Sequence, residues 1–328
     1  MKRREFMGVV GGAALTWPFT ARAQKAKPVI AFLGSGAADA DSSKVQMSLL
    51  EAGMRELGLV QGQDYLLDVR WAGSDASRFS PLAAELLAGH PGAVVVSTNL
   101  AAIAVQKLSP TVPIVGTGLN APVETGLVAS LARPGGNITG VATMADDVLI
   151  KLFEFMRELL PRERRIAVMK NPTNPSNPLM LDRLTAHAAN NGLLIDAVSV
   201  GAPADLDSAF AAISRQPPGA LLVLTDNSLF ALADRIVTQA LAHRVPTFGN
   251  FSYPFARAGA LLAYSRDPKE AFQGVARLLR KILSGAAPSE LPFEQPTKFN
   301  LFVNLKTAKA LGIEIPPTLL ATADEVIE

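Results

Sequence analysis

The sequence predicts an α/β protein of two lobes, each built on a parallel sheet covered by helices. Short β-branched and apolar runs alternate with longer helical patterns along the chain. Such alternation is typical of parallel sheets that are covered on both faces. The second half of the chain also repeats the strand and turn signals of the first half. A length of 328 residues is more than one ordinary core needs, which again favours two domains.

The expected strands and helices follow one another in order. Strands are expected at residues 29–33, 66–71, 93–96, 114–116, 166–169, 194–200, 220–224 and 246–248. Helices are expected at residues 43–57, 79–88, 100–108, 148–160, 179–190, 206–214, 229–243 and 269–283. Gly58 and Gly192 directly follow two helical patterns, where glycine commonly ends a helix.

Two pairs of segments carry the internal repeat. Residues 91–96 (Pro-Gly-Ala-Val-Val-Val) match residues 218–223 (Pro-Gly-Ala-Leu-Leu-Val), and residues 112–117 match residues 245–250. Buried parallel strands resemble one another in general, but the matched proline and glycine positions favour duplication over coincidence. The pattern indicates one α/β unit used twice rather than a solenoid with a short period.

The N-terminal segment, residues 1–23, reads as an export signal. Basic residues 2–4 precede a mostly apolar stretch at 6–19, and Ala-Arg-Ala at 21–23 fits a cleavage site before Gln24. The paired arginines resemble a twin-arginine signal, with a Sec signal as the alternative. No cysteine follows for a lipid anchor. We therefore expect a periplasmic mature chain that is soluble and not inserted in the membrane.

Composition excludes several classes of protein. The full chain has 31 basic and 29 acidic residues, a net charge of +2, and the export segment carries +3 of it, leaving −1. This balance argues against a nucleic-acid-binding surface. The absence of cysteine excludes disulfides, cysteine nucleophiles and cysteine-ligated zinc. The mature chain has no apolar run near the ~18 residues that a membrane span needs.

Small polar residues follow six of the predicted strands, three in each half. In open parallel sheets, ligands bind beyond the carboxyl ends of the strands. Hydroxyls, amides and helix-start N–H groups suit polar or anionic groups, and the one acid, Asp226, suits an ammonium group. The same residue types also cap helices, which is the structural alternative for Asp226 and Asn99. The site residues predicted on these loops are Ser35, Gly36, Ser97, Thr98, Asn99, Thr117, Asn120, Asn171, Thr173, Asn174, Asp226, Asn227, Asn250 and Phe251.

Enzyme motifs are incomplete. The sequence Gly34-Ser35-Gly36 begins like a dinucleotide fingerprint, but Asp39 occupies the position of the third glycine. Neither a phosphate-binding loop ending in Gly-Lys-Ser/Thr nor a Gly-x-Ser-x-Gly elbow occurs. The three histidines lie in or just after predicted helices, so we expect no metal site and no cofactor. An exported two-lobe transferase or hydrolase is the alternative, with Asp226 as its strongest candidate base.

Several ordered segments resemble a known family. They are residues 1–6, 69–72, 126–131, 133–140, 295–299, 304–312 and 316–320. In these segments the chain resembles the substrate-binding proteins of ABC importers, in the branch related to tryptophan- and tyrosine-binding members. The resemblance covers nearly the whole chain and implies the type I periplasmic-binding fold, a small-molecule solute, a cognate ABC permease and a monomer.

The resemblance also implies where the chain crosses between the lobes. Lobe I would comprise residues 24–141 and 265–298, and lobe II residues 142–264 and 299–328. Three crossings would join the lobes, which close on the ligand by a hinge motion. In related amino-acid binders, hydroxyls and backbone amides hold the carboxylate, and an acid of lobe II holds the ammonium group.

On this pattern the ammonium-binding acid corresponds to Asp226. Many relatives have Ser-Ser-Gly after the first strand, where this chain has Gly34-Ser35-Gly36. An aromatic ligand would need a stacking partner, and the nearby candidates are Phe251 and Tyr264, for each of which a place in the core is the equal alternative.

Overall fold

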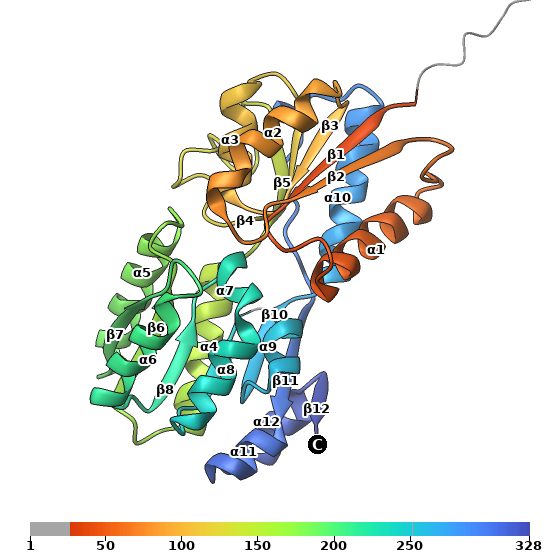
Figure 1. Cartoon of the computed structure of the whole chain (residues 1–328). Helices are drawn as coiled ribbons and strands as arrows, with labels where there is room; N and C mark the ends of the chain where they lie inside the picture. Colours follow the sequence, from red (N-terminus) through yellow and green to blue (C-terminus); the bar gives the residue numbers. More distant parts are fainter. Residues whose placement is uncertain (1–26, 251) are drawn as a thin grey trace, which may run out of the picture.

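The computed structural model describes residues 27–250 and 252–328, which form two α/β lobes (Figure 1). The expected export signal at residues 1–23 and the candidate ligand residue Phe251 lie outside the described residues. The predicted fold class, two lobes with parallel sheets joined by crossings, is confirmed.

Lobe I is built on a five-stranded sheet in the order β2-β1-β3-β4-β5, with every pair parallel. Its strands are β1 (Val29–Gly34), β2 (Leu66–Trp71), β3 (Ala93–Val96), β4 (Ile114–Leu119) and β5 (Ile138–Ala142). Its helices are α1 (Asp41–Glu56), α2 (Phe79–Ala88), α3 (Asn99–Leu108) and α10 (Pro268–Leu283). The last of these comes from a distant part of the chain.

Lobe II is built on a seven-stranded sheet in the order β12-β11-β10-β9-β8-β6-β7. Its strands are β6 (Arg165–Lys170), β7 (Leu194–Ser199), β8 (Ala220–Val223), β9 (Thr247–Gly249), β10 (Leu262–Arg266), β11 (Phe299–Asn304) and β12 (Glu325–Ile327). Only the β10–β11 pair is antiparallel. Its helices are α4 (Ala145–Leu159), α5 (Asn177–Asn190), α6 (Asp205–Arg215), α7 (Asn227–Ala231), α8 (Ala233–Ala242), α9 (Ser252–Ala258), α11 (Leu305–Leu311) and α12 (Pro317–Thr322).

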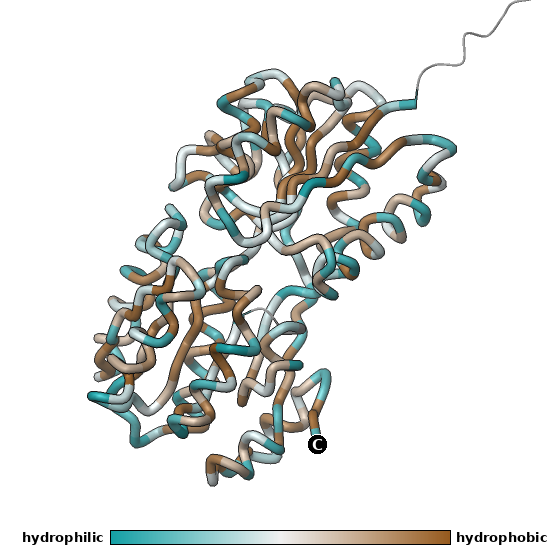
Figure 2. Tube along the Cα trace, viewed as in Figure 1, coloured by the Kyte–Doolittle hydropathy of each residue, from teal (hydrophilic) through white to brown (hydrophobic). Residues whose placement is uncertain are grey.

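Each sheet buries both faces, because successive residues of a strand point to opposite sides. In β1, Ile30 and Phe32 pack with the α1–α10 side, whereas Ala31 and Leu33 pack with the α2–α3 side. Lobe II repeats this arrangement along β6 and β8. Figure 2 shows the resulting apolar strands at the centre of each lobe. This two-sided burial explains why the strands read as short continuous apolar runs.

Three crossings connect the lobes. The chain leaves lobe I between β5 and α4, returns between β10 and α10, and leaves again before β11. Strand β10 extends to Arg266, two residues beyond the return expected at Tyr264. The last crossing is held against the first, because Ala142 N donates to Glu294 O at 2.9 Å and Glu294 N donates to Gly140 O at 2.9 Å.

One helix prediction is wrong in its continuity. The pattern at residues 229–243 forms two helices, α7 and α8, which meet at Leu232. Leu232 leaves the helical conformation, with φ −100° and ψ 6°. The apolar spacing continues across the break, so the pattern alone reads as one helix.

Candidate functional site

A pocket of about 30 Å³ lies between the carboxyl ends of the strands of the two lobes. Seven of the predicted site residues line it: Ser35, Thr98, Asn99, Asn171, Asn174, Asp226 and Asn227. Five lining residues were not predicted: Ser74, Ala76, Phe79, Leu100 and Ser228. Ser74 and Ala76 follow β2, whose polar end at Gly73-Ser74-Asp75 was the sequence signal available for them.

Asp226 is held by four hydrogen bonds at the lobe II wall of this pocket. Its Oδ1 accepts from the backbone N–H groups of Ser228 (2.8 Å) and Leu229 (3.0 Å), and so caps α7. Its Oδ2 accepts from the side-chain amides of Asn171 (3.2 Å) and Asn174 (2.8 Å). A carboxylate offers about four acceptor positions, and all are used here. Asp226 therefore caps a helix, as the structural alternative predicted. A ligand ammonium group would have to compete with the two amides for the oxygens of Asp226.

Two side-chain turns aim those amides at Asp226. Asn171 Oδ1 accepts from Thr173 N at 3.0 Å and from Thr173 Oγ1 at 2.8 Å. Asn174 Oδ1 accepts from Ser176 N at 3.0 Å and from Ser176 Oγ at 2.8 Å. In both turns the oxygen is engaged locally, which leaves the nitrogen free to donate. Thr173 itself is exposed and shapes the loop rather than the pocket wall.

The lobe I loops are equally tied together. Ser35 N donates to Ser97 Oγ at 3.0 Å, and Ala101 N donates to Thr98 Oγ1 at 3.1 Å, which caps α3. Asn99 donates from Nδ2 to Asn120 O at 2.7 Å and accepts at Oδ1 from Asn120 N at 2.9 Å. This buried pair of bonds fixes the loop after β4 to the start of α3.

Gly36 follows Ser35 in the loop after β1. A methyl group on Gly36 would lie 2.9 Å from Ser43 Oγ, so the absence of a side chain allows this loop to approach α1 closely. The structure thus gives Gly36 a packing role next to the pocket.

The two lobes touch each other directly around the pocket. Asn227 Nδ2 donates to Ser97 O at 2.9 Å, and Asn120 Nδ2 donates to Thr225 O at 3.4 Å. Nearer the surface, Arg183 of α5 pairs with Glu124 at 2.9 Å and also with Asp146. The lobes are therefore closed on each other in this structure.

A second pocket lies beside the first, on the side of the first crossing. Its wall includes Asn120, Glu124, Thr143, Asp146 and Met180. Asn120 is a predicted site residue, and the structure assigns it to this pocket rather than to the first. A hydrogen bond links the two pockets, because Asn99 of the first donates to the backbone carbonyl of Asn120 of the second.

Arg266, at the end of β10, is a charged residue that the sequence reasoning missed. Its Nη2 donates to Thr117 O at the end of β4, and its Nη1 is buried without a hydrogen-bond partner. Burial lowers the pKa of the Arg266 guanidinium to about 10. No carboxylate pairs with it among the residues that the structure describes. The signal in the sequence was an isolated cation at the end of a strand. That strand had not been predicted, so the signal was not recognised.

Three further predicted residues lie at strand ends but do not line the first pocket. Ser97, Thr117 and Asn250 are all buried at strand ends. Asn250 Nδ2 donates to Thr225 Oγ1, and Asn250 Oδ1 is buried without a partner, as is Asn120 Oδ1.

Tyr264 lies elsewhere, which corrects its prediction as a cleft residue. Its ring stacks on Phe299, with centroids 5.6 Å apart, and meets Phe155 edge-on at 5.7 Å. These contacts place it against the core of lobe II, and burial raises the pKa of its phenol. No strand had been predicted at residues 262–266, so there was no element from which to place Tyr264.

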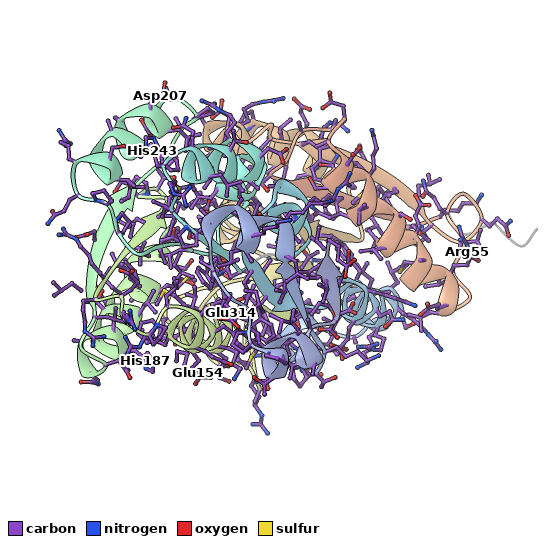
Figure 3. All side chains as sticks on the ribbon, turned by 90° about the horizontal axis from the view of Figure 1, so that it is seen from below. Arg55, Glu154, His187, Asp207, His243 and Glu314 are labelled. Atoms are coloured by element: carbon purple, nitrogen blue, oxygen red, sulfur yellow. The ribbon has the colours of Figure 1, made fainter. Side chains whose placement is uncertain are left out.

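Two histidines belong to lobe II, His187 in α5 and His243 directly after α8 (Figure 3). His187 packs edge-on against Phe153, and His243 stacks on Phe210. Within residues 27–250 and 252–328, no three His, Asp or Glu side chains group so as to hold a metal ion. Helices in these same ranges are too short or too polar to cross a bilayer.

Comparison with known proteins gives one consistent result. A family model described as "ABC transporter substrate binding protein" matches residues 9–327. A tyrosine-binding protein of Clostridioides difficile is 22% identical over 261 residues, which span 80% of this chain and 74% of that protein.

Solved structures share the same fold. An ABC domain from Streptococcus pneumoniae in complex with L-Trp has a TM-score of 0.84 at 21% identity, covering 92% of this chain and 100% of that one. A conserved domain protein from Vibrio cholerae has a TM-score of 0.85 at 24% identity, covering 92% and 99%.

Proposed function

Because this chain belongs to the family of ABC transporter substrate-binding proteins, we propose that it captures a small zwitterionic amino acid and delivers it to a membrane permease. The observation that carries the proposal is the first pocket. It lies at the strand ends, where ligands of open α/β sheets bind, and both lobes contribute its walls.

The proposed ligand class is an aromatic amino acid. One relative is a tyrosine-binding protein and another was solved with L-Trp, which supports this class. Polar amides and hydroxyls surround the pocket, and Phe79 and Leu100 supply apolar wall. In this reading the polar groups orient the ligand, and the apolar wall contacts its side chain.

Export to the periplasm is part of the proposal. The signal-like residues 1–23, with their paired arginines, support it, as does the family's usual location outside the cytoplasmic membrane. We further propose that the mature chain is a monomer. Its lobes would hinge at the crossings, with lobe boundaries near residues 141, 264 and 298.

The enzyme alternative has a weaker basis. Asp226 is the one acidic side chain among those that line the first pocket, and its acceptor positions are all occupied. A general base needs a free acceptor within reach of a substrate proton. We therefore propose a binding role without catalysis.

A ligand screen tests the proposal. The mature chain from Gln24 onward is titrated by calorimetry with the twenty amino acids and with tyramine and tryptamine, after a thermal-shift screen. A ligand at 100 times its dissociation constant should add about 2.7 kcal/mol of stability, a clear shift in melting temperature. Binding of L-tyrosine or L-tryptophan, recovered unchanged after incubation, is the expected result. Conversion of the ligand would support the enzyme alternative, and no binding of any amino acid would contradict the proposed ligand class.

A matched pair of variants locates the site. Asn174→Ala removes a polar side chain from the wall of the first pocket, whereas Asn190→Ala alters an exposed residue at the end of α5. We expect Asn174→Ala to weaken ligand binding and Asn190→Ala to leave it unchanged. Equal affinities for the two variants would place the site elsewhere.

A further inference from the structure

Arg266 is placed where a ligand group would meet both lobes. It belongs to the lobe II sheet, yet its Nη2 donates to Thr117 O in lobe I. A methyl group on Gly118 would lie 3.2 Å from Arg266 Nη2, 3.6 Å from Ser97 O and 3.8 Å from Thr143 Cγ2. Arg266 itself lines neither pocket, but it lies close to Thr143, which lines the second pocket, and to Ser97 O, which accepts from Asn227 of the first.

The guanidinium is incompletely satisfied. An arginine has five N–H donors in a fixed fork, which matches a carboxylate through two parallel hydrogen bonds. One bond from Nη2 goes to a carbonyl, and Nη1 is buried with none. A buried charge without a counter-ion is costly, and proteins normally pair such a group. Arg165 and Arg277, by contrast, each pair with a carboxylate of the protein itself.

Two unsatisfied acceptors accompany this donor. Asn120 Oδ1 and Asn250 Oδ1 are buried without partners, one from each lobe. Both asparagines donate to Thr225, to its carbonyl and its hydroxyl respectively, so their amides are neighbours. Asn120 also lies three residues after Thr117, the contact of Arg266. One unpaired cationic donor and two unpaired acceptors are therefore buried among the loops through which the two lobes contact each other.

We infer that Arg266 binds the α-carboxylate of the ligand through a charge-assisted pair, while Asn120 and Asn250 accept from its amino group. The inference rests on the proposed function and specifies how its ligand is held. It differs from the arrangement that the family resemblance implies, in which hydroxyls hold the carboxylate and Asp226 holds the ammonium group. Asp226 is already fully hydrogen-bonded, whereas these three groups are not.

The inference has a consequence for the lobes. Arg266 already links lobe II to lobe I through Thr117. Nη1 is buried where loops of both lobes meet, so a carboxylate bound to it would contact both lobes. Ligand binding and closure would then be coupled through one side chain.

The test compares probes with and without a carboxylate. L-tyrosine and L-tryptophan are titrated against tyramine and tryptamine, into the wild-type mature chain and the variants Arg266→Met and Arg266→Lys. Removing one partner of a desolvated charge pair typically weakens binding by roughly 30-fold or more. We expect a loss of this size for the amino acids in Arg266→Met, a smaller loss in Arg266→Lys, and little change for the two amines. Arg235→Met, which removes an exposed arginine of α8, serves as the control and should change neither.

A second readout needs no ligand. If Arg266 is kept for a ligand, Arg266→Met should melt at the same temperature as the unliganded wild type or higher, because an unpaired buried charge is removed. A lower melting temperature that Arg266→Lys restores would overturn the inference in favour of a structural role. Equal losses for amino acids and amines would also overturn it. The wild type could also fail to bind any amino acid while Arg266→Met still melts at the wild-type temperature or higher. That result would contradict the proposed function, and with it the assignment of an amino-acid carboxylate to Arg266.

Discussion

The two lobes use the same residue differently at the same position of their repeated unit. Asn99 begins the helix after β3, and Asn227 begins the helix after β8. Asn99 bonds twice to Asn120 within its own lobe, whereas Asn227 donates to Ser97 O across the cleft. The first bond pair builds a loop, and the second contact exists only when the lobes meet. A duplicated position can therefore serve stability in one lobe and closure in the other.

The helix caps differ in the same way. Thr98 caps α3 with a neutral hydroxyl, while Asp226 caps α7 with a carboxylate that also gathers two amides from the loop after β6. At the residue before the helix, lobe I thus has one local hydrogen bond, whereas lobe II has a carboxylate that accepts four. The five predictions below test these positions and the contacts between the lobes, beginning with the largest expected effect.

Asn99→Ala should cost the most stability. The substitution leaves the buried backbone N–H and C=O of Asn120 without their partners. Two buried groups left unsatisfied should lower the free energy of unfolding by about 2–4 kcal/mol. Urea unfolding followed by circular dichroism measures this, with Asn190→Ala as the control. A loss below about 0.5 kcal/mol would show that the Asn99 bonds are not structural.

The two caps should differ by about twofold. Thr98→Ala removes one capping bond and should cost about 1 kcal/mol. Asp226→Ala removes a cap and leaves Asn171 and Asn174 without their acceptor, so a loss of about 2–3 kcal/mol is expected. The same unfolding experiment compares them. Equal losses would mean that the amide network around Asp226 adds nothing to its capping role.

Asn227→Ala should affect closure more than stability. Its bond to Ser97 O crosses the cleft, so its loss should change the free energy of unfolding by less than about 1 kcal/mol. The closed population of the unliganded chain should fall, because the closed form alone contains this bond. Small-angle X-ray scattering would report a larger radius of gyration. An unchanged radius of gyration with a large loss of stability would contradict this prediction, because Asn227 would then stabilise the fold as Asn99 does rather than closure.

The smallest effect is expected at the exposed inter-lobe ion pair. Arg183 pairs with Glu124, and both side chains are more than 40% exposed, at 47% and 42%. Arg183→Gln should shift closure by about 0.2–1 kcal/mol, and less in high salt.

The same pair should respond to pH. The hydrogen bond from Arg183 lowers the pKa of Glu124 below its usual 4.5. Its contribution is therefore complete above that value and lost as the pH falls through the lowered pKa. Scattering from pH 7 to pH 3 would detect this, with Arg183→Gln as the variant that should lack the response.

Most of the fold was predictable because its strands are buried on both faces. The strands β1, β3 and β8 are continuous apolar runs, and these were found at or near their true bounds. The strands missed were β5, β10, β11 and β12. β5 carries Thr139 and Gly140 inside it, and β11 carries Asn300 and Asn304 beside its antiparallel neighbour. Their identity as strands depends on partners from distant parts of the chain.

The site was predictable to the extent that it follows strand ends. Seven residues of the first pocket were found from that rule, and Ser74 was missed because the end of β2 was left out. Arg266 could not be found, because its strand was not predicted and its isolation is a property of three dimensions. Tyr264 was misplaced for the related reason that the end of β10 was unknown.

The helix α10 has a consequence for how the chain acquires its structure during synthesis. It packs against α1 and completes one face of the lobe I core, yet it follows most of lobe II in the sequence. The N-terminal sheet therefore stays open on one side until residues 268–283 have left the ribosome. Lobe II in turn waits for β11 and β12. Such late, long-range pairing slows folding, and it leaves apolar strands exposed in the nascent chain for a chaperone to protect.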